Sequence, residues 1–216
     1  MIKLHNYFRS SASYRVRIAL NLKGLSYEYL PVHLTKDGGQ QLAPSFRALN
    51  PESLVPVLDD EGTIVTQSLA IIEYLEETRP EPPLLPRDAA ERAYVRSIAL
   101  AIACEIHPLN NLRVLRYLVK TLGLTEDQKN AWYRHWVEQG LASVEARLVA
   151  EGRSRRYVLG DAVTLGDVLI VPQIFNAQRF DCNLDALPTV MQIFDNCMQL
   201  PAFVDARPAA QPDANT

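Results

Sequence analysis

Residues 10–20 read Ser-Ser-Ala-Ser-Tyr-Arg-Val-Arg-Ile-Ala-Leu and follow a short apolar run that begins at Ile2. Apolar residues recur at helical spacing in the second half of this stretch, so it predicts a strand followed directly by a helix. Ser10 and Ser11 stand where the helix begins, and the first amide N–H groups of a helix have no partner within it. These amides carry partial positive charge. The turn between strand and helix therefore suits an anion, and in particular a thiolate held by hydroxyl groups.

The first 80 residues continue this alternation and predict the order β-α-β-α-β-β-α. Gly24 ends the first helix, and glycines mark residues 36–41 as a loop. Strands are predicted at residues 2–7, 27–32, 55–58 and 63–66, and the first and last of the three helices at residues 11–23 and 69–75. This order predicts a small mixed sheet covered by helices.

The chain changes character after residue 80. Residues 79–86 hold four prolines, which exclude a regular helix or a central strand there. Beyond them strand patterns disappear, and capping signals for new helices recur at Asp88, Thr125 and Thr164. We therefore predict an α/β domain over residues 1–80, a proline-rich linker over 81–87 and an all-helical domain over 88–216. The polar tail from Arg207 to Thr216 is expected to be mobile.

The composition is that of an ordinary globular protein of one or two domains: 216 residues, 48% hydrophobic and 22% charged. A net charge of −3 argues against a nucleic-acid-binding surface. The longest apolar run, residues 98–104, is too short to cross a bilayer. The first residues show no apolar segment before a small-residue cleavage site, so a secreted protein is not expected. The three cysteines lack metal-ligand spacing, so they predict reduced, mostly buried thiols, a cytoplasmic protein and no metal site.

Two further segments of the α/β region carry ligand-binding signals. Gln67 and Ser68 precede an apolar helical stripe, so Ser68 is expected either to serve only as a helix cap or, with Gln67, to bind a carboxylate on the free amides. The pair Val55–Pro56 lies at the start of a predicted strand. Most X-Pro bonds are trans, and the proline alone is compatible with an ordinary strand start.

The helical region holds polar side chains among apolar ones near a helix-bending proline: His107, Asn111 and Arg113. Such side chains either line a cleft or have a structural role, with their polar groups hydrogen-bonded within the core. Arg9 abuts the serine pair, and Arg179 lies about four turns beyond the predicted helix start at Thr164. Paired guanidinium groups suit a dicarboxylate, whereas ion pairs between the domains are the competing explanation.

Together these motifs resemble the zeta class of the glutathione transferases over nearly the whole chain, at residues 10–20, 36–41, 48–51 and 67–80. The resemblance implies a thioredoxin-like α/β domain followed by an all-α domain, glutathione as cofactor, and a homodimer. It also implies a cis Val55–Pro56 bond, so that the Val55 backbone pairs with the cysteinyl residue of glutathione. The other site residues that it implies are Ser10 or Ser11 for the thiolate, Gln67 and Ser68 for the γ-glutamyl carboxylate, Gln41, His107, Asn111 and Arg113 around glutathione and substrate, and Arg9 and Arg179 for a dicarboxylate substrate.

Zeta-class enzymes commonly isomerise maleylacetoacetate in tyrosine and phenylalanine breakdown, and this is the activity that the resemblance predicts. The alternatives are isomerisation of maleylpyruvate, a general conjugating or dehalogenating transferase, and a non-catalytic binding module of the same fold. Leu112 beside Arg113, in place of two arginines, favours the longer substrate. Ala12 stands where many zeta proteins have cysteine, which excludes disulfide exchange there and leaves the hydroxyl chemistry intact.

Overall fold

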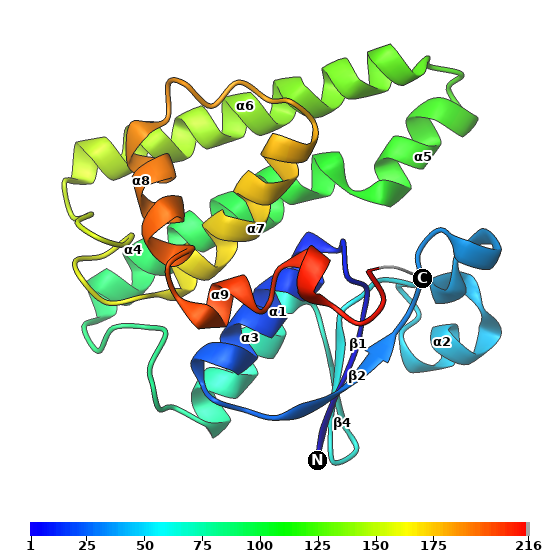
Figure 1. Ribbon diagram of the computed structural model, residues 1–216, viewed down its shortest axis with the longest axis horizontal. Helices are drawn as coiled ribbons and strands as arrows, with labels where there is room; N and C mark the ends of the chain where they lie inside the picture. The colour runs from blue at the N-terminus through cyan, green and yellow to red at the C-terminus, as the bar shows by residue number, and fades with distance from the viewer. Residues whose placement is uncertain (215–216) are drawn as a thin grey trace. The chain divides into compact units, whose positions relative to one another are not determined.

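The computed structural model describes residues 1–214, which divide into two compact units. Unit 1 contains Met1–Pro83 and the described residues from Leu200 on, and unit 2 spans Leu84–Gln199. The elements of unit 1 are β1 (Ile2–Asn6), α1 (Ser11–Leu22), β2 (Tyr27–Pro31), α2 (Pro44–Leu49), β3 (Val57–Asp60), β4 (Thr63–Thr66), α3 (Ser68–Thr78) and α9 (Pro201–Val204) (Figure 1). Those of unit 2 are α4 (Ala89–Leu100), α5 (Leu112–Lys120), α6 (Glu126–Glu151), α7 (Leu165–Arg179) and α8 (Pro188–Cys197).

The sheet of unit 1 has the strand order β2-β1-β3-β4. Strand β1 runs parallel to β2, while β3 is antiparallel to both β1 and β4. Leu4, in the middle of β1, pairs with Tyr29 on one side and Leu58 on the other. Alternate residues of β1 are buried, as the two-residue period of a strand requires. The predicted β-α-β-α-β-β-α order and mixed sheet are confirmed.

Helix α1 starts where the serine pair predicts. Ser10 is its N-cap residue, and the Ser10 Oγ accepts a hydrogen bond from the Ser13 N–H at 3.2 Å. Helices α3 and α9 both pack against α1 (Figure 1). All ten residues from Ser11 to Leu20 are buried, including Arg15 and Arg17. Two buried guanidinium groups in one helix need polar partners within unit 1.

Unit 2 is built from helices α4 to α8. Helix α4 passes into a π-helical turn, Ala101–Ile106, and then a 3-10 turn, His107–Asn110, before α5 begins. Helix α6 approaches this segment closely, because a Cβ atom added at Gly140 would lie 2.4 Å from the Ile106 Cγ1 atom. The predicted helix starts are confirmed: Thr125 and Gln128 cap each other reciprocally, and the Asp88 carboxylate accepts from the Glu91 N–H at 2.9 Å.

The end of the chain differs from the expected mobile tail. Residues 208–210 form a 3-10 turn, and Gln211 and Asp213 are buried. The Gln211 Nε2 atom donates to two carbonyl groups of its own segment, and Asp213 accepts from the N–H of Phe8, 205 positions earlier. Composition cannot reveal partners so far away in sequence. The described residues from Leu200 on thus belong to unit 1, although the sequence predicts a helical domain up to residue 216; residues 215 and 216 lie outside the described chain.

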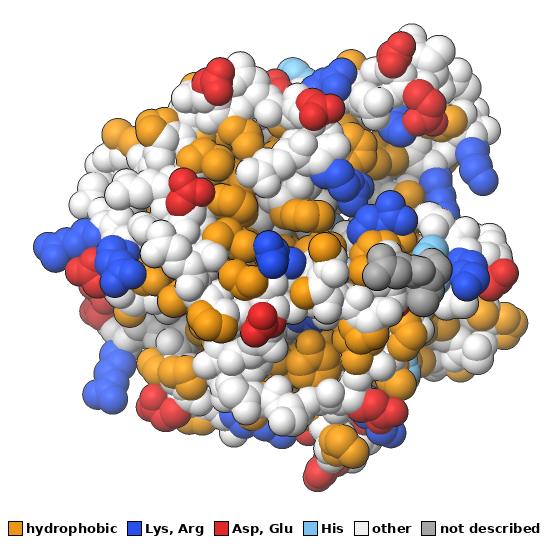
Figure 2. Space-filling model, in the orientation of Figure 1, with side chains coloured by type: hydrophobic (Ala, Val, Ile, Leu, Met, Phe, Trp, Pro, Cys, Tyr) orange, Lys and Arg blue, Asp and Glu red, His pale blue; other side chains and the backbone are white. Residues whose placement is uncertain are grey.

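The surface carries charges of both signs. Figure 2 shows basic and acidic side chains interspersed over the visible face. No helix of residues 1–214 is long and apolar enough to cross a bilayer, and no three His, Cys, Asp or Glu side chains of this part of the chain gather as metal ligands would. Cys197 is buried and Cys182 partly so, but Cys104 is exposed. The expectation of mostly buried thiols is therefore wrong for Cys104, which lies in the π-helical turn.

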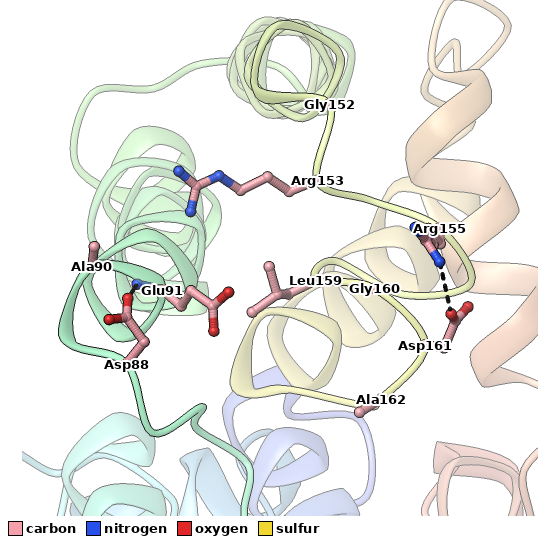
Figure 3. A pocket seen from close by; sticks show the side chains of 10 residues that line it. All are labelled: Asp88, Ala90, Glu91, Gly152, Arg153, Arg155, Leu159, Gly160, Asp161 and Ala162. Carbon is pink, nitrogen blue, oxygen red and sulfur yellow. Dashed lines mark hydrogen bonds and ion pairs between the residues drawn. The ribbon is translucent and has the colours of Figure 1, made fainter.

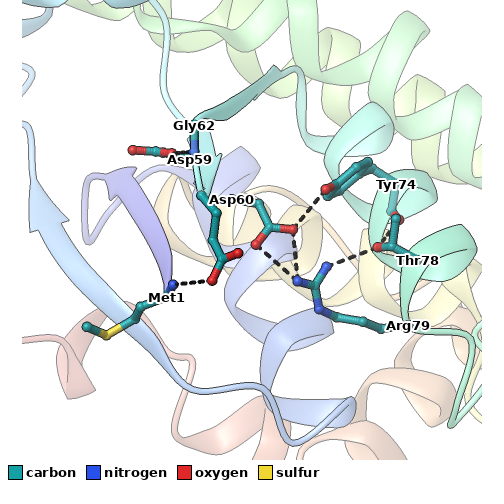
Figure 4. A network of polar contacts seen from close by, with 8 residues as sticks. Met1, Asp59, Asp60, Gly62, Tyr74, Thr78 and Arg79 are labelled. Atoms are coloured by element: carbon teal, nitrogen blue, oxygen red, sulfur yellow. Dashed lines mark hydrogen bonds and ion pairs between the residues drawn. The ribbon is translucent and has the colours of Figure 1, made fainter.

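A polar network joins β3 to the end of α3 (Figure 4). The Asp60 carboxylate accepts from the Tyr74 hydroxyl at 2.8 Å and pairs with the Arg79 guanidinium at 2.8 Å. Burial raises the pKa of the Asp60 carboxyl, but the hydrogen bonds from Tyr74 and Arg79 outweigh burial, so the net pKa lies below its usual value. A carboxyl whose pKa is depressed by folding stabilises the fold above its unfolded pKa and loses that contribution as the pH falls through the folded pKa.

We expect Arg79→Met to lower the free energy of unfolding by about 1 kcal/mol at pH 7, because Arg79 is partly exposed to solvent and the Tyr74 hydroxyl still donates to Asp60 in the variant. The difference from the parent protein should shrink as the pH falls below the usual aspartate pKa of about 4 and then through the lowered pKa of folded Asp60, where the carboxylate takes up its proton. Urea unfolding at pH 7 and pH 3.5 measures both effects. Arg87→Met, at an exposed arginine in the adjoining linker, is the matched control. A loss that is the same at both pH values would contradict the assignment to Asp60.

Candidate functional site

The turn between β1 and α1 brings the predicted thiolate ligands together. The Ser10 N–H donates to the Tyr7 carbonyl at 3.0 Å, which closes a four-residue turn. Ser10 is half-buried and its Oγ is fixed by the Ser13 N–H, whereas Ser11 is only 5% exposed in the first turn of α1. A hydroxyl can accept and donate at once. Ser10 therefore keeps its proton for a further acceptor that approaches from outside.

Arg9 is the third residue of this turn, and its side chain is exposed. Its guanidinium lies 4.9 Å from the Phe8 ring centroid and 6.0 Å from that of Tyr7. At these distances the guanidinium forms cation–π interactions with the aromatic rings. The side chain is thus adjacent to Ser10, and no carboxylate of residues 1–214 forms an ion pair with it. It is free to meet an anionic ligand at the turn.

The start of α3 differs in one respect from the sequence expectation. Gln67, and not Ser68, is the N-cap residue; its φ of 68° lies in the left-handed region. Ser68 is the first helical residue and is buried, and its Oγ accepts from the Arg15 Nη1 at 3.3 Å. The Gln67 Nε2 donates to the Glu52 carboxylate at 2.7 Å. The expectation that Ser68 caps the helix is wrong, while the serine does lie at the helix start that suits a carboxylate.

Arg15 is a candidate site residue that sequence reasoning missed. It is 1% exposed, and its bond to Ser68 places a guanidinium beside the first turn of α3. Positive charge and free helix amides at one point favour a carboxylate. The bond also brings the beginnings of α1 and α3 together. The available signal was two arginines, Arg15 and Arg17, within a helix that is otherwise apolar on its inner face.

Val55 and Gln41 offer backbone and amide groups in the same unit. The Val55–Pro56 peptide bond is cis, as the resemblance implies. Val55 lies before β3 and belongs to no helix or strand. Within residues 1–214, its N–H and C=O form no backbone hydrogen bond. The buried Gln41 side chain donates weakly to the Leu34 carbonyl at 3.5 Å, and its Oε1 has no partner in the described chain.

Unit 2 carries the remaining predicted residues. His107 Nε2 lies 3.5 Å from the Asn111 Nδ2, and the Asn111 side chain caps α5 by accepting from the Arg113 N–H at 3.1 Å. Arg113 itself is exposed. The structure thus brings His107 and Asn111 together at the turn before α5, with the Arg113 backbone as part of the cap. Asn111 has a local structural role that the sequence analysis did not assign to it.

Arg179 ends α7 and is exposed. Its guanidinium lies 4.9 Å from the Phe180 ring centroid, and that ring stacks on Tyr133 with centroids 3.7 Å apart. The aromatic pair holds the residue that follows Arg179 against α6. The Arg179 guanidinium therefore lies at the surface of unit 2, next to the stacked rings of Phe180 and Tyr133.

A surface hollow of unit 2 contains none of the predicted site residues (Figure 3). It lies between the start of α4, at Asp88 and Glu91, and the loop that follows α6. Arg155 and Asp161 on that loop pair with each other at 3.6 Å. The hollow is lined by charges of both signs, so it carries no consistent electrostatic preference for a ligand.

Comparison with known proteins yields consistent matches. A family model described as the N-terminal domain of glutathione S-transferase matches residues 4–83. A probable maleylacetoacetate isomerase of Vibrio cholerae is 50% identical over 98% of this chain and 97% of its own length. A solved holo structure of a maleylpyruvate isomerase, described as a bacterial zeta-class glutathione S-transferase, is 48% identical with a TM-score of 0.95 and covers 98% of this chain and 99% of its own. A maleylacetoacetate isomerase of Methylobacterium extorquens with bound malonate and glutathione is 40% identical, also with a TM-score of 0.95, over 99% of this chain and 100% of its own.

Proposed function

Since the chain belongs to the zeta class of the glutathione transferases, we propose that it is a glutathione-dependent isomerase that converts maleylacetoacetate to fumarylacetoacetate. The observation that carries the proposal is the pair of helix starts in unit 1. One presents the Ser10 hydroxyl at the N-cap of α1, and the other presents Ser68 and Arg15 at the first turn of α3. The start of α1 suits a thiol and the start of α3 suits a carboxylate, and one small molecule can carry both groups.

The chemistry of unit 1 fits glutathione along its length. We assign the γ-glutamyl carboxylate to Ser68 and Gln67, with Arg15 behind Ser68 as the positive charge. The cysteinyl backbone pairs with the Val55 N–H and C=O, which form no ladder of their own, as an extended peptide does at a strand edge. Gln41, whose buried Oε1 has no protein partner among the described residues, supplies an acceptor for a further amide of the tripeptide.

Ser10 is our choice for the thiolate ligand. Its Oγ is held in place by the Ser13 N–H, it is more exposed than Ser11, and its proton remains available to donate. Lowering a thiol pKa from about 8.5 by two units needs about 2.7 kcal/mol of preference for the anion. A hydroxyl that donates to a charged acceptor supplies about 1.5–3 kcal/mol and a helix start about 0.3–1 kcal/mol. These two contributions suffice without a cationic base.

When bound, glutathione supplies a thiolate that adds to the cis double bond, permits rotation about the resulting single bond, and leaves to restore a trans double bond. We assign to Arg9 and Arg179 the binding of the substrate carboxylates, since guanidinium groups bind carboxylates with two parallel hydrogen bonds. Holding both ends of the substrate fixes its double bond relative to Ser10. We assign His107, Asn111 and Arg113 to the wall that contacts glutathione and substrate.

The activity is tested with purified protein, maleylacetoacetate and glutathione, followed by the ultraviolet absorbance of the substrate and coupled to the hydrolase that consumes the product. We expect turnover that depends on glutathione without consuming it. The proposal would be overturned if turnover persisted without glutathione, or if no turnover occurred when glutathione was present. Retention of the protein on immobilised glutathione without turnover would favour a binding module, and net loss of glutathione thiol would favour a conjugating or dehalogenating transferase.

Maleylpyruvate is the second substrate to be tested in the same assay. The 48% identity and TM-score of 0.95 to the zeta-class structure described as a maleylpyruvate isomerase favour maleylpyruvate as the alternative. Leu112 beside Arg113 favours the longer maleylacetoacetate, because one guanidinium fewer stands at that point. The ratio of kcat/KM for the two substrates, measured side by side, decides between them.

We further propose that the protein works as a cytoplasmic homodimer. The cysteines of the described chain are free thiols, as a reducing compartment requires. Light scattering of the purified protein tests the dimer, and a mass equal to one chain of 24.3 kDa would exclude it.

The carboxylate assignment predicts a specific binding defect. Ser68→Ala should weaken glutathione binding about tenfold or more, because a hydroxyl bond to a charged acceptor is worth about 1.5–3 kcal/mol. Isothermal titration calorimetry measures the dissociation constant. Ser45→Ala, at an exposed serine of α2, is the control and should bind as the parent does. An unchanged affinity for Ser68→Ala in a folded protein would contradict the assignment.

A further inference from the structure

The turn that carries Ser10 is held by groups from both ends of the chain. The Tyr7 carbonyl, which accepts from the Ser10 N–H, also accepts from the Arg17 Nη1 at 3.4 Å. The Phe8 carbonyl accepts from the Arg17 Nη2 at 3.0 Å. Arg17 is fully buried, so this guanidinium fixes the turn from the side of α1.

Asp213 fixes the same turn from the opposite end of the sequence. One carboxylate oxygen accepts from the Phe8 N–H at 3.2 Å, and the other accepts from the Tyr29 hydroxyl at 2.5 Å. Burial and the bond to Asp213 raise the pKa of Tyr29, so its hydroxyl stays protonated and donates. Asp213 is itself 5% exposed. Both backbone polar groups of Phe8 are thus held, the carbonyl by Arg17 and the N–H by Asp213.

The segment before Asp213 is anchored along α1. The Tyr14 hydroxyl donates to the Phe203 carbonyl at 3.1 Å, and the Arg17 Nε donates to the Ala206 carbonyl at 3.1 Å. Helix α9 packs on α1 (Figure 1), and Ala214 packs against the cluster that includes the Tyr7 and Phe8 rings. Asp213 therefore arrives at Phe8 on a segment that is fixed over its length.

We propose that Asp213 is a positioning residue for the isomerase: held in place by the Tyr29 hydroxyl, it sets the Tyr7–Ser10 turn through the Phe8 N–H, and thereby aims the Ser10 hydroxyl at the sulfur of glutathione. This inference rests on the proposed function. Ser10 is only two residues beyond Phe8 and is bonded to the Tyr7 carbonyl, so a displaced Phe8 peptide displaces the hydroxyl. A hydrogen bond of this kind weakens steeply when its angle or length departs from the optimum.

The test compares Asp213→Ala with Asp205→Ala in the full-length protein. Asp205 is an exposed carboxylate of the same segment, so the control removes the same group without touching the turn. Three quantities are measured: the pKa of the bound glutathione thiol from the ultraviolet absorbance of the thiolate, the affinity for S-methylglutathione, whose sulfur cannot ionise, and the hydrogen-exchange rate of the Phe8 amide.

We expect Asp213→Ala to raise the thiol pKa of bound glutathione by about one unit, in line with a partial loss of one charged hydrogen bond. The affinity for S-methylglutathione should stay within about twofold of the parent, since that ligand gains nothing from a thiolate donor. The Phe8 amide should exchange faster. Asp205→Ala should match the parent in all three quantities.

A faster Phe8 amide with an unchanged thiol pKa would overturn the inference, because Asp213 would then serve only to anchor the chain. If Asp213→Ala does not fold, Tyr29→Phe replaces it: that variant removes one donor to Asp213 and should raise the thiol pKa in the same direction by less, and no shift would overturn the inference. A parent protein that fails to lower the thiol pKa at all would overturn the proposed function and this inference together, a result that is distinct from a failure of Asp213 alone.

Discussion

Ser10→Ala should lower kcat/KM for the isomerisation about 100-fold at neutral pH. The substitution removes the hydroxyl that donates to the thiolate, a loss of about 1.5–3 kcal/mol for a bond to a charged acceptor. The pKa of the bound glutathione thiol should then rise toward the value of about 8.5 found in solution. The deficit should therefore be largest at low pH and shrink above about pH 9, where the thiol ionises unaided. A pH profile of kcat/KM together with the thiolate absorbance of the complex measures both effects.

Two companion variants separate this role from helix capping. Ser10→Ala also removes the bond to the Ser13 N–H, which should cost about 1 kcal/mol of stability. Ser10→Asp keeps a capping oxygen but brings a negative charge and no proton to donate, so it should fold well and remain inactive. Ser11→Ala should lose less than tenfold in kcat/KM, since that residue is the more buried of the two. Strong loss in Ser11→Ala with near-normal activity in Ser10→Ala would reverse our assignment.

The sequence predicts the α/β unit well because its signals are local. Alternating apolar residues mark β1, and serines at the start of an apolar stripe mark α1. Both patterns extend over only a few residues, so residues that are close in sequence are enough to determine the strand and the helix. The capping signals at Asp88 and Thr125 behave in the same way. Where an element depends on its own residues, pattern and structure agree.

The departures share a different origin. Gln67 becomes the cap of α3 by taking a left-handed φ of 68°, a conformation for which a non-glycine residue gives no sequence signal. Asp213 is ordered by Phe8 and Tyr29, which lie 205 and 184 positions away. A polar, proline-containing tail is mobile by composition unless distant partners hold it. The Arg15–Ser68 bond spans 53 positions, and the sequence alone shows only an unexplained arginine.

Asp167→Ala should lower the free energy of unfolding by about 3–5 kcal/mol, the largest stability effect that we expect in this chain. The fully buried Asp167 carboxylate accepts from the Val158 N–H at 2.8 Å, the Thr164 N–H at 2.7 Å and the Thr164 hydroxyl at 2.8 Å. Alanine leaves two buried amides without an acceptor, at about 1–3 kcal/mol each. Urea unfolding followed by circular dichroism measures the change.

Burial is what separates Asp167 from the other aspartate that caps a helix start in unit 2. Asp88 is exposed and accepts one bond, from the Glu91 N–H, so Asp88→Ala should cost only about 1 kcal/mol because water can replace the lost acceptor. Asp167→Asn keeps one acceptor oxygen and should fall between the two. An Asp167→Ala variant that is no less stable than Asp88→Ala would mean that the loop at Val158 rearranges to satisfy its amides, and that this loop, rather than the carboxylate, sets the stability of the start of α7.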